Sequence, residues 1–257
     1  MVGAGNLATC LGVALKSAGL CPEAVWSRSE RSAHALATRL GCAATADMDS
    51  LPDAGIVVTA VSDDALPEVA KRVAARYPDS IVVHTAGSVS IDVWKGTHAR
   101  RYGVFYPMQT FSKGKDVDFS KVGIFVEGNS EEVCRQLELL ARRLSPLVYR
   151  ITGEQRAYLH IAAVFACNFT NAMCSIAAEL LEKQGLPFEI MLPLIDETAA
   201  KLHLLQPREA QTGPAHRRDA TIIGRQSNML ADDKKEIYDL VTRYIVNKAC
   251  KNMDSEK

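Results

Sequence analysis

Short apolar runs rich in β-branched residues alternate with longer amphipathic stretches over the first 150 residues. The pattern predicts strands at 23–26, 56–61, 81–84, 102–106 and 122–126, and helices at 7–17, 29–40, 66–76 and 131–144. The run 56–61 is apolar almost throughout, as a strand covered on both faces requires. Such alternation is typical of an α/β architecture with a doubly wound parallel sheet. We therefore expect one such domain over residues 1–151.

The pattern changes after residue 151, where no further strand is predicted. Helices are expected at 154–184, 187–205, 217–231 and 234–250, so residues 152–257 are predicted to form an all-helical domain for substrate binding and dimerisation. Stretch 161–181 is long and apolar enough to span a bilayer. Because it contains Asn168, Asn171 and Glu179, we expect a helix buried in the domain core or in a homodimer interface, and no membrane segment.

A glycine-rich turn opens the chain, with Gly3, Gly5 and Ala8 at the spacing G-x-G-x-x-A. In this motif the first glycine permits a tight turn, the second admits a pyrophosphate to the backbone, and the small third residue allows close helix packing. Asn6 and Leu7 begin the helix whose free N–H groups would bind phosphate. The sequence thus predicts a dinucleotide site.

Two residues, Met1 and Val2, precede this turn, whereas the motif normally follows a strand of about five or six residues. The first strand is therefore predicted to be truncated. We interpret the truncation as a misplaced start codon or a trimmed chain, and not as an argument against the fold.

The residues after strand 23–26 indicate which dinucleotide is bound. An NAD enzyme carries an acidic residue here for the ribose 2′-hydroxyl, but this chain has Ser27, Arg28 and Ser29. A guanidinium beside two hydroxyls suits a 2′-phosphate. NADP(H) is therefore favoured, while Glu30 keeps NAD(H) open and Arg28 could also be a solvated loop residue.

Other strand ends are expected at the same edge of the sheet, where doubly wound folds bind ligands. Residues that would contact the cofactor there are Ala60, Val61, Ser62, Thr85 and Ala86. Gln109 follows the next strand and is a candidate for substrate binding. His84 could donate a proton, although a histidine that ends a strand is more often part of a structural hydrogen bond.

Polar side chains also gather on the first helix of the second domain. At about 100° per residue, His160, Val164, Asn168 and Asn171 fall within a sector of roughly 80°. Unpaired polar groups are costly to bury, so they should face each other or a ligand cavity. His160 could protonate a substrate that Asn168 orients, which makes these two the candidate catalytic residues. A satisfied structural network is the alternative.

Segment 211–219 contributes the last candidates. A Gly-Pro pair makes a turn into a predicted helix with Arg217 in its first turn, where a cation opposes the helix dipole. Arg217 therefore needs an anionic partner, which could be a substrate carboxylate, a cofactor phosphate or Asp219. Thr212 and Arg217 are candidate substrate-binding residues.

Composition excludes several classes of function. Thirty Lys and Arg residues balance thirty Asp and Glu residues, so no basic field would attract nucleic acid or anionic lipid. The seven cysteines form no C-x-x-C pair, so neither a metal site nor a disulfide framework is predicted. Without a secretory signal pattern, we expect a cytoplasmic protein.

Five motifs carry a resemblance to a known family over essentially the whole chain. They are GAGNLA at 3–8, HTAGS at 84–88, FYPMQTFS at 105–112, LHIAAVFACNFTN at 159–171 and QTGPAHRRD at 211–219. The chain resembles NADP oxidoreductases of unassigned substrate that join a Rossmann-like N-terminal domain to a helical C-terminal domain of unknown function. That group is similar to pyrroline-5-carboxylate reductase and, more distantly, to the 6-phosphogluconate dehydrogenase C-terminal-like group.

The resemblance implies a Rossmann-like fold and a nicotinamide cofactor, with two departures. Tyr106 stands where many relatives have a histidine before the proline, and Val164 stands where hydroxyacid dehydrogenases carry a catalytic lysine. We expect an NADP-dependent oxidoreductase that transfers a hydride to or from a small C=O or C=N substrate. A non-catalytic NADP(H) sensor is the alternative, and a nucleotide-independent ligand-binding protein is a third hypothesis.

Overall fold

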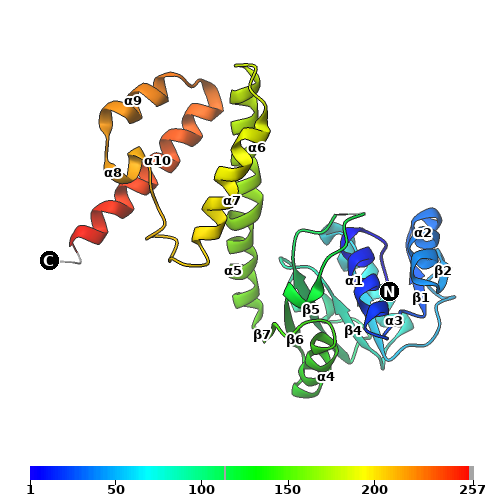
Figure 1. Ribbon diagram of the computed structural model, residues 1–257. Helices are drawn as coiled ribbons and strands as arrows, with labels where there is room; N and C mark the ends of the chain where they lie inside the picture. Colours follow the sequence, from blue (N-terminus) through cyan, green and yellow to red (C-terminus); the bar gives the residue numbers. More distant parts are fainter. Residues whose placement is uncertain (113, 255–257) are drawn as a thin grey trace. The chain divides into compact units, whose positions relative to one another are not determined.

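The computed structural model describes residues 1–112 and 114–254, and their side chains up to residue 249. The chain divides into two compact units, Met1–Cys167 and Asn168–Lys257 (Figure 1). The first unit contains the sheet together with helix α5 (Gly153–Ala163). It thus extends past residue 151, where the sequence pattern places the domain boundary.

The sheet of the first unit has the order β2-β1 and β3-β4-β5-β6-β7, and Val2 joins its two parts. Val2 forms parallel bridges to Trp26 of β1 and to Thr59 of β3, which confirms the short first strand. All paired strands run parallel except β5 and β6, which are antiparallel. The strands are β1 (Ala24–Trp26), β2 (Ala43–Thr45), β3 (Ile56–Thr59), β4 (Ile81–His84), β5 (Arg101–Met108), β6 (Gly123–Gly128) and β7 (Val148–Arg150).

Helices cover both faces of this sheet because their apolar residues recur at helical spacing. Helices α1 (Asn6–Ser17) and α4 (Glu131–Arg142) pack with β4 and β6 in one core cluster, and α3 (Leu66–Arg76) packs on Val57 and Val82 in a second. Helix α2 (Glu30–Leu40) lies against β1 and β2. Figure 1 shows α4 beside β6 at the edge of the unit. The four predicted helices are confirmed.

A single helical run links the first unit to the second. It consists of α5, a π-helical segment (Val164–Phe169) and α6 (Thr170–Glu182). A capping box between Thr152 and Gln155 fixes the start of α5. By length and composition alone, Gly153–Glu182 could cross a membrane, but none of its apolar window is buried within the chain. The prediction that the chain's own core buries this helix is therefore wrong, while a homodimer interface is untested.

The second unit is helical, as predicted. Its helices after α6 are α7 (Leu192–Lys201), α8 (Pro214–Arg217), α9 (Ala220–Asn228) and α10 (Asp232–Asp254), and α10 contacts α8 and α9. Short 3₁₀ turns span Asp63–Ala65, Ile91–Trp94, Phe119–Lys121 and, in this unit, Phe188–Met191. Among residues 168–249, the buried side chains are those of Ala215 and Ser227. The described part of this unit therefore has no closed hydrophobic core of its own.

Candidate functional site

A cavity of about 600 Å³ opens at the carboxyl ends of β1, β3, β4 and β5. Most of the predicted dinucleotide-binding residues line it, together with Tyr106 and Pro107 of β5 and His160 of α5. From the predicted set these are Gly3, Gly5, Asn6, Leu7, Ser27, Arg28, Ala60, Val61, Ser62, Thr85 and Ala86. The structure thus brings together four segments that lie far apart in the sequence.

Gly3 shapes the first wall of this cavity. Its φ of 114° lies in the region that favours glycine, and a Cβ there would lie 2.1 Å from the carbonyl oxygen of Ala60. Gly5 caps α1 with its backbone alone, so the N–H groups of the first turn point to the cavity side without a side-chain partner. The turn therefore has the shape and the donors that a phosphate needs.

Arg28 and Ser29 play different parts. Arg28 is exposed at the cavity and forms no ion pair with any residue that the structure describes. Ser29 does not line the cavity, because its side chain accepts a hydrogen bond from the Ser32 N–H and caps α2. Ala8 is fully buried between α1 and β1, where its small side chain serves helix packing rather than ligand contact.

A tyrosine and a histidine meet on the wall of the cavity. Tyr106 Oη on β5 lies 3.2 Å from His160 Nδ1 on α5, and both residues line the cavity. Gly87 permits this approach, since a Cβ there would lie 2.6 Å from His160 Nδ1 and 2.8 Å from Tyr106 Cζ. The sequence indicates a catalytic role for His160, whereas Tyr106 is distinguished there only as a departure from relatives. The position of Tyr106 at the end of predicted strand 102–106, at the ligand-binding edge of the sheet, was the feature that could have indicated its role.

The electrostatics of this pair keep the phenol protonated. Burial raises the pKa of Tyr106, which more than offsets the opposing effect of the Arg156 guanidinium. The hydroxyl is therefore available as a hydrogen-bond donor or acceptor at neutral pH. Among the described residues, Tyr106 is the hydrogen-bond partner of His160, and none binds the histidine Nε2.

Arg156 lies one turn before His160 and anchors α5 to the sheet. Its guanidinium pairs with Glu127 of β6 and donates to the Val89 carbonyl oxygen at 2.6 Å. Only 2% of the Arg156 side chain is exposed. These contacts fix the first turn of the helix, and with it the position of His160.

His84 lies in the sheet and not on the cavity wall. Its side chain is fully buried, and its Nδ1 accepts a hydrogen bond from the Ala86 N–H at 3.2 Å. Burial, with a further contribution from Arg156, lowers the pKa of His84 to about 3. A fully buried ring that stays neutral and does not line the cavity fits the structural interpretation better than that of a proton donor.

The remaining candidates are less closely grouped. Gln109 lines the cavity, whereas Asn168, Thr212 and Arg217 are exposed residues of the second unit. Asn168 lies in the π-helical segment, where i→i+5 bonding widens the turn, so the 100° repeat used in the sequence does not apply.

Arg217 departs from its predicted place in a helix. It ends the four-residue helix α8, so its predicted place in the first turn of a long helix is wrong. The next residue, Arg218, is left-handed with a φ of 58°, and Asp219 caps a new helix. The argument from the helix dipole therefore does not hold for Arg217.

Comparison with known proteins places these two units in context. Residues 1–101 match the model of a Rossmann-like domain, and residues 122–245 match a domain of unknown function, DUF2520. No curated protein matches the sequence. Two solved structures share the fold at low identity: a pyrroline-5-carboxylate reductase from Coxiella burnetii (18% identity, 97% of this chain and 96% of that chain, TM-score 0.60) and an imine reductase from Myxococcus stipitatus in complex with NADP⁺ (16%, 99% and 93%, TM-score 0.66).

One solved structure is much closer in sequence. The "putative NADP oxidoreductase" of Bacteroides fragilis is 46% identical, the alignment covers 96% of each chain, and the TM-score is 0.89. Such identity over nearly the whole of both chains indicates common family membership. The protein therefore belongs to the family that joins a Rossmann-like domain to a DUF2520 domain, as the sequence motifs predicted.

Proposed function

We propose that the protein binds NADP(H) in the 600 Å³ cavity and transfers a hydride between it and a small compound with a C=O or C=N group. The observation that carries this proposal is that one cavity is lined both by the glycine-rich turn at Gly3 and Gly5 and by the hydrogen-bonded pair of Tyr106 and His160. The name of the Bacteroides fragilis relative and the NADP⁺ held by the imine reductase support it.

The residues at one end of the cavity fit a dinucleotide. The backbone at Gly3 leaves no room for a side chain, and the first-turn N–H groups of α1 would bind the pyrophosphate. Arg28, which has no ion-pair partner among the described residues, would bind the 2′-phosphate. No acidic residue stands at 27–29, where a 2′-hydroxyl would require one.

The residues at the other end would handle the proton. When bound, the nicotinamide supplies or accepts the hydride at the substrate carbon. For reduction, His160 Nε2 donates a proton to the substrate oxygen or nitrogen, so that hydride and proton together saturate the double bond. The Tyr106 hydroxyl donates to Nδ1 and so selects the tautomer with the hydrogen on Nε2. Gln109, which lines the cavity, would bind the substrate.

Titration with NADPH and NADH tests the cofactor assignment directly. We expect micromolar binding of NADPH and much weaker binding of NADH. Replacing Arg28 with alanine should weaken NADPH binding by about tenfold or more, since a hydrogen bond to a charged group contributes roughly 1.5–3 kcal/mol, and should leave NADH binding unchanged. Arg31→Ala is the matched control, because Arg31 is exposed nearby but does not line the cavity. If Arg28→Ala lowers the affinity for NADPH by no more than a few-fold, Arg28 does not bind the 2′-phosphate.

We also propose that the helical unit forms a homodimer. Large apolar side chains lie exposed on it, including Leu194, Leu204, Met229, Leu240 and Tyr244, and the part of the unit that the structure describes buries almost none. A second copy of the chain would cover these side chains. Sedimentation equilibrium should give twice the chain mass of 28.0 kDa. A monomer at micromolar concentration would contradict the proposal.

A further inference from the structure

One carboxylate lines the cavity of about 600 Å³, and the proposed function gives it no role. Asp63 follows β3 and begins the 3₁₀ turn before α3, and its side chain is exposed. Among the described residues that line the cavity, Arg28 is the only lysine or arginine and Asp63 is the only aspartate or glutamate. Because Arg28 is assigned to the 2′-phosphate, no lysine or arginine of the cavity wall is left to bind a carboxylate of the substrate.

Hydrogen bonding places Asp63 near the histidine and tyrosine pair. The Ser88 hydroxyl donates a hydrogen bond to Asp63 Oδ2. Ser88 directly follows Gly87, where a Cβ would lie 2.6 Å from His160 Nδ1 and 2.8 Å from Tyr106 Cζ. The residue that binds Asp63 and the residue that contacts the pair are therefore neighbours in the chain.

The Asp63 carboxylate is available to a ligand. Its Oδ1 has no hydrogen-bond partner among the described residues, and it forms no ion pair with any of them. Burial is the main cause that raises the pKa of Tyr106, and Asp63 raises it further while Arg156 opposes both. The negative charge of Asp63 therefore acts on the groups that would meet the substrate.

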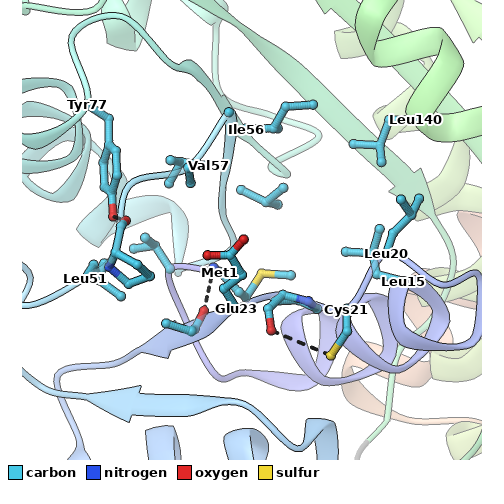
Figure 2. Close-up of a pocket in the computed structure, with 17 residues that line it drawn as sticks. Met1, Leu15, Leu20, Cys21, Glu23, Leu51, Ile56, Val57, Tyr77 and Leu140 are labelled. Carbon is cyan, nitrogen blue, oxygen red and sulfur yellow. Dashed lines mark hydrogen bonds between the residues drawn. The ribbon is translucent and has the colours of Figure 1, made fainter.

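A second cavity, of about 300 Å³, offers a useful contrast. It lies at the amino ends of β1 and β3, and Figure 2 shows that apolar side chains such as Leu20, Leu51 and Leu140 line it. It also contains a carboxylate, that of Glu23, but none of the described residues that line it is a histidine. Of these two cavities, only the larger one combines a carboxylate with a histidine that could transfer a proton.

The sign of this charge distinguishes the two substrate classes of the proposed function. When an imine nitrogen is protonated it becomes positive, and a nearby carboxylate stabilises that charge. When a carbonyl carbon accepts a hydride, negative charge develops on the oxygen, and the same carboxylate destabilises it. Bound NADP(H) strengthens this preference, since a phosphate monoester alone carries about −1.5 to −2 charges at pH 7.

We propose that Asp63 determines specificity, and that it selects substrates with a basic C=N nitrogen and no carboxylate. The nitrogen lone pair takes the proton from His160, and the N–H that results donates a hydrogen bond to Asp63 Oδ1. The carbon then accepts the hydride, and the π electrons of the C=N bond become the lone pair of the product amine. The inference rests on the proposed function, which supplies the hydride and the proton.

Binding of stable ring compounds to the NADP⁺ complex tests this inference without turnover. Pyrrolidine is a protonated amine, proline is the same ring with a carboxylate, and cyclopentanol is a neutral ring of similar size. We expect pyrrolidine to bind at least about tenfold more tightly than the other two, since a hydrogen bond between charged groups contributes about that much. Asp63→Asn should remove the advantage. Asp64→Asn is the matched control and should keep it, because Asp64 is exposed in the same turn but does not line the cavity.

Titration with NADP⁺ separates this inference from the proposed function. Failure of the parent protein to bind NADP⁺ would overturn the proposed function, and the inference with it. If NADP⁺ binds, equal affinities for pyrrolidine and proline, or equal effects of Asp63→Asn and Asp64→Asn, would overturn the inference alone. Weaker NADP⁺ binding by Asp63→Asn would mean that the carboxylate binds a ribose hydroxyl of the cofactor, and would also overturn it.

Steady-state reduction of 1-pyrroline and cyclopentanone gives a second readout. Asp63→Asn should lower kcat/KM for the imine by at least about tenfold, and should leave kcat/KM for the ketone equal or higher. A proportional loss with both compounds would mean that Asp63 only maintains the structure of the site, and would overturn the inference.

Discussion

Replacing Arg156 with leucine is expected to lower the free energy of unfolding by about 3–5 kcal/mol, as for other buried ion pairs that lose one partner. The reason is that Glu127, whose side chain is only 17% exposed, would keep its charge without the guanidinium that pairs with it. The Val89 carbonyl oxygen would lose its donor as well. In thermal unfolding, the Tm should fall by on the order of 10 °C.

Two further variants separate this effect from a general loss of charge. Arg100→Leu removes an arginine whose pair with Asp79 is exposed, and it should leave the Tm almost unchanged. The double variant Arg156→Leu with Glu127→Leu removes both buried charges and should recover most of the lost stability. If Arg156→Leu unfolds at the temperature of the Arg100→Leu control, the buried pair does not hold α5 as described.

The glycine turn and Arg28 could be predicted because their signals are local. Gly3, Gly5 and Ala8 have a fixed spacing, and each is small because the turn and the helix that follows it leave little room for a side chain. The structure adds the reason for Gly3, since its missing Cβ leaves room for the Ala60 carbonyl. Strands β2 and β7 could not be predicted, because, unlike the equally short and fully buried β1, each consists of half-buried and exposed residues with little apolar pattern.

Of the histidine and tyrosine pair, only the histidine could be predicted from the sequence. His160 was found on a helical face, but its partner Tyr106 lies 54 residues earlier, on another element. Nothing in one sequence specifies that β5 and the first turns of α5 meet. Asn168 was grouped with His160 by an α-helical period that the π-helical segment interrupts.

Turnover separates an enzyme from a nucleotide sensor that uses the same cavity. Hydride transfer to a C=O or C=N group needs a proton donor, and in the proposed function His160, positioned by Tyr106, would be that donor. A sensor would bind NADPH, leave every imine and ketoacid of a substrate panel unreduced, and change its oligomeric state on binding. Variants of His160 and Tyr106 therefore distinguish the enzyme hypothesis from the sensor hypothesis most directly.

Replacing His160 with alanine is expected to lower kcat for imine or ketone reduction by about 10²–10⁴-fold, the usual contribution of general acid catalysis. NADPH binding should stay within a few-fold of the parent value, because the residues proposed to bind the phosphates, Gly3, Gly5 and Arg28, belong to other segments of the chain than His160. Stopped-flow measurement of NADPH oxidation gives kcat, and titration with NADPH gives the dissociation constant of the cofactor.

Tyr106→Phe provides the sharper test, since it keeps the ring and removes only the hydroxyl that contacts His160 Nδ1. Because Tyr106 acts through His160, its loss should lower kcat and change the pH profile of kcat in the parent, but should cost almost nothing in the His160→Ala background. Additive losses in the double variant would mean that Tyr106 contacts the substrate itself. Equal kcat in Tyr106→Phe and the parent protein would remove the pair from the mechanism.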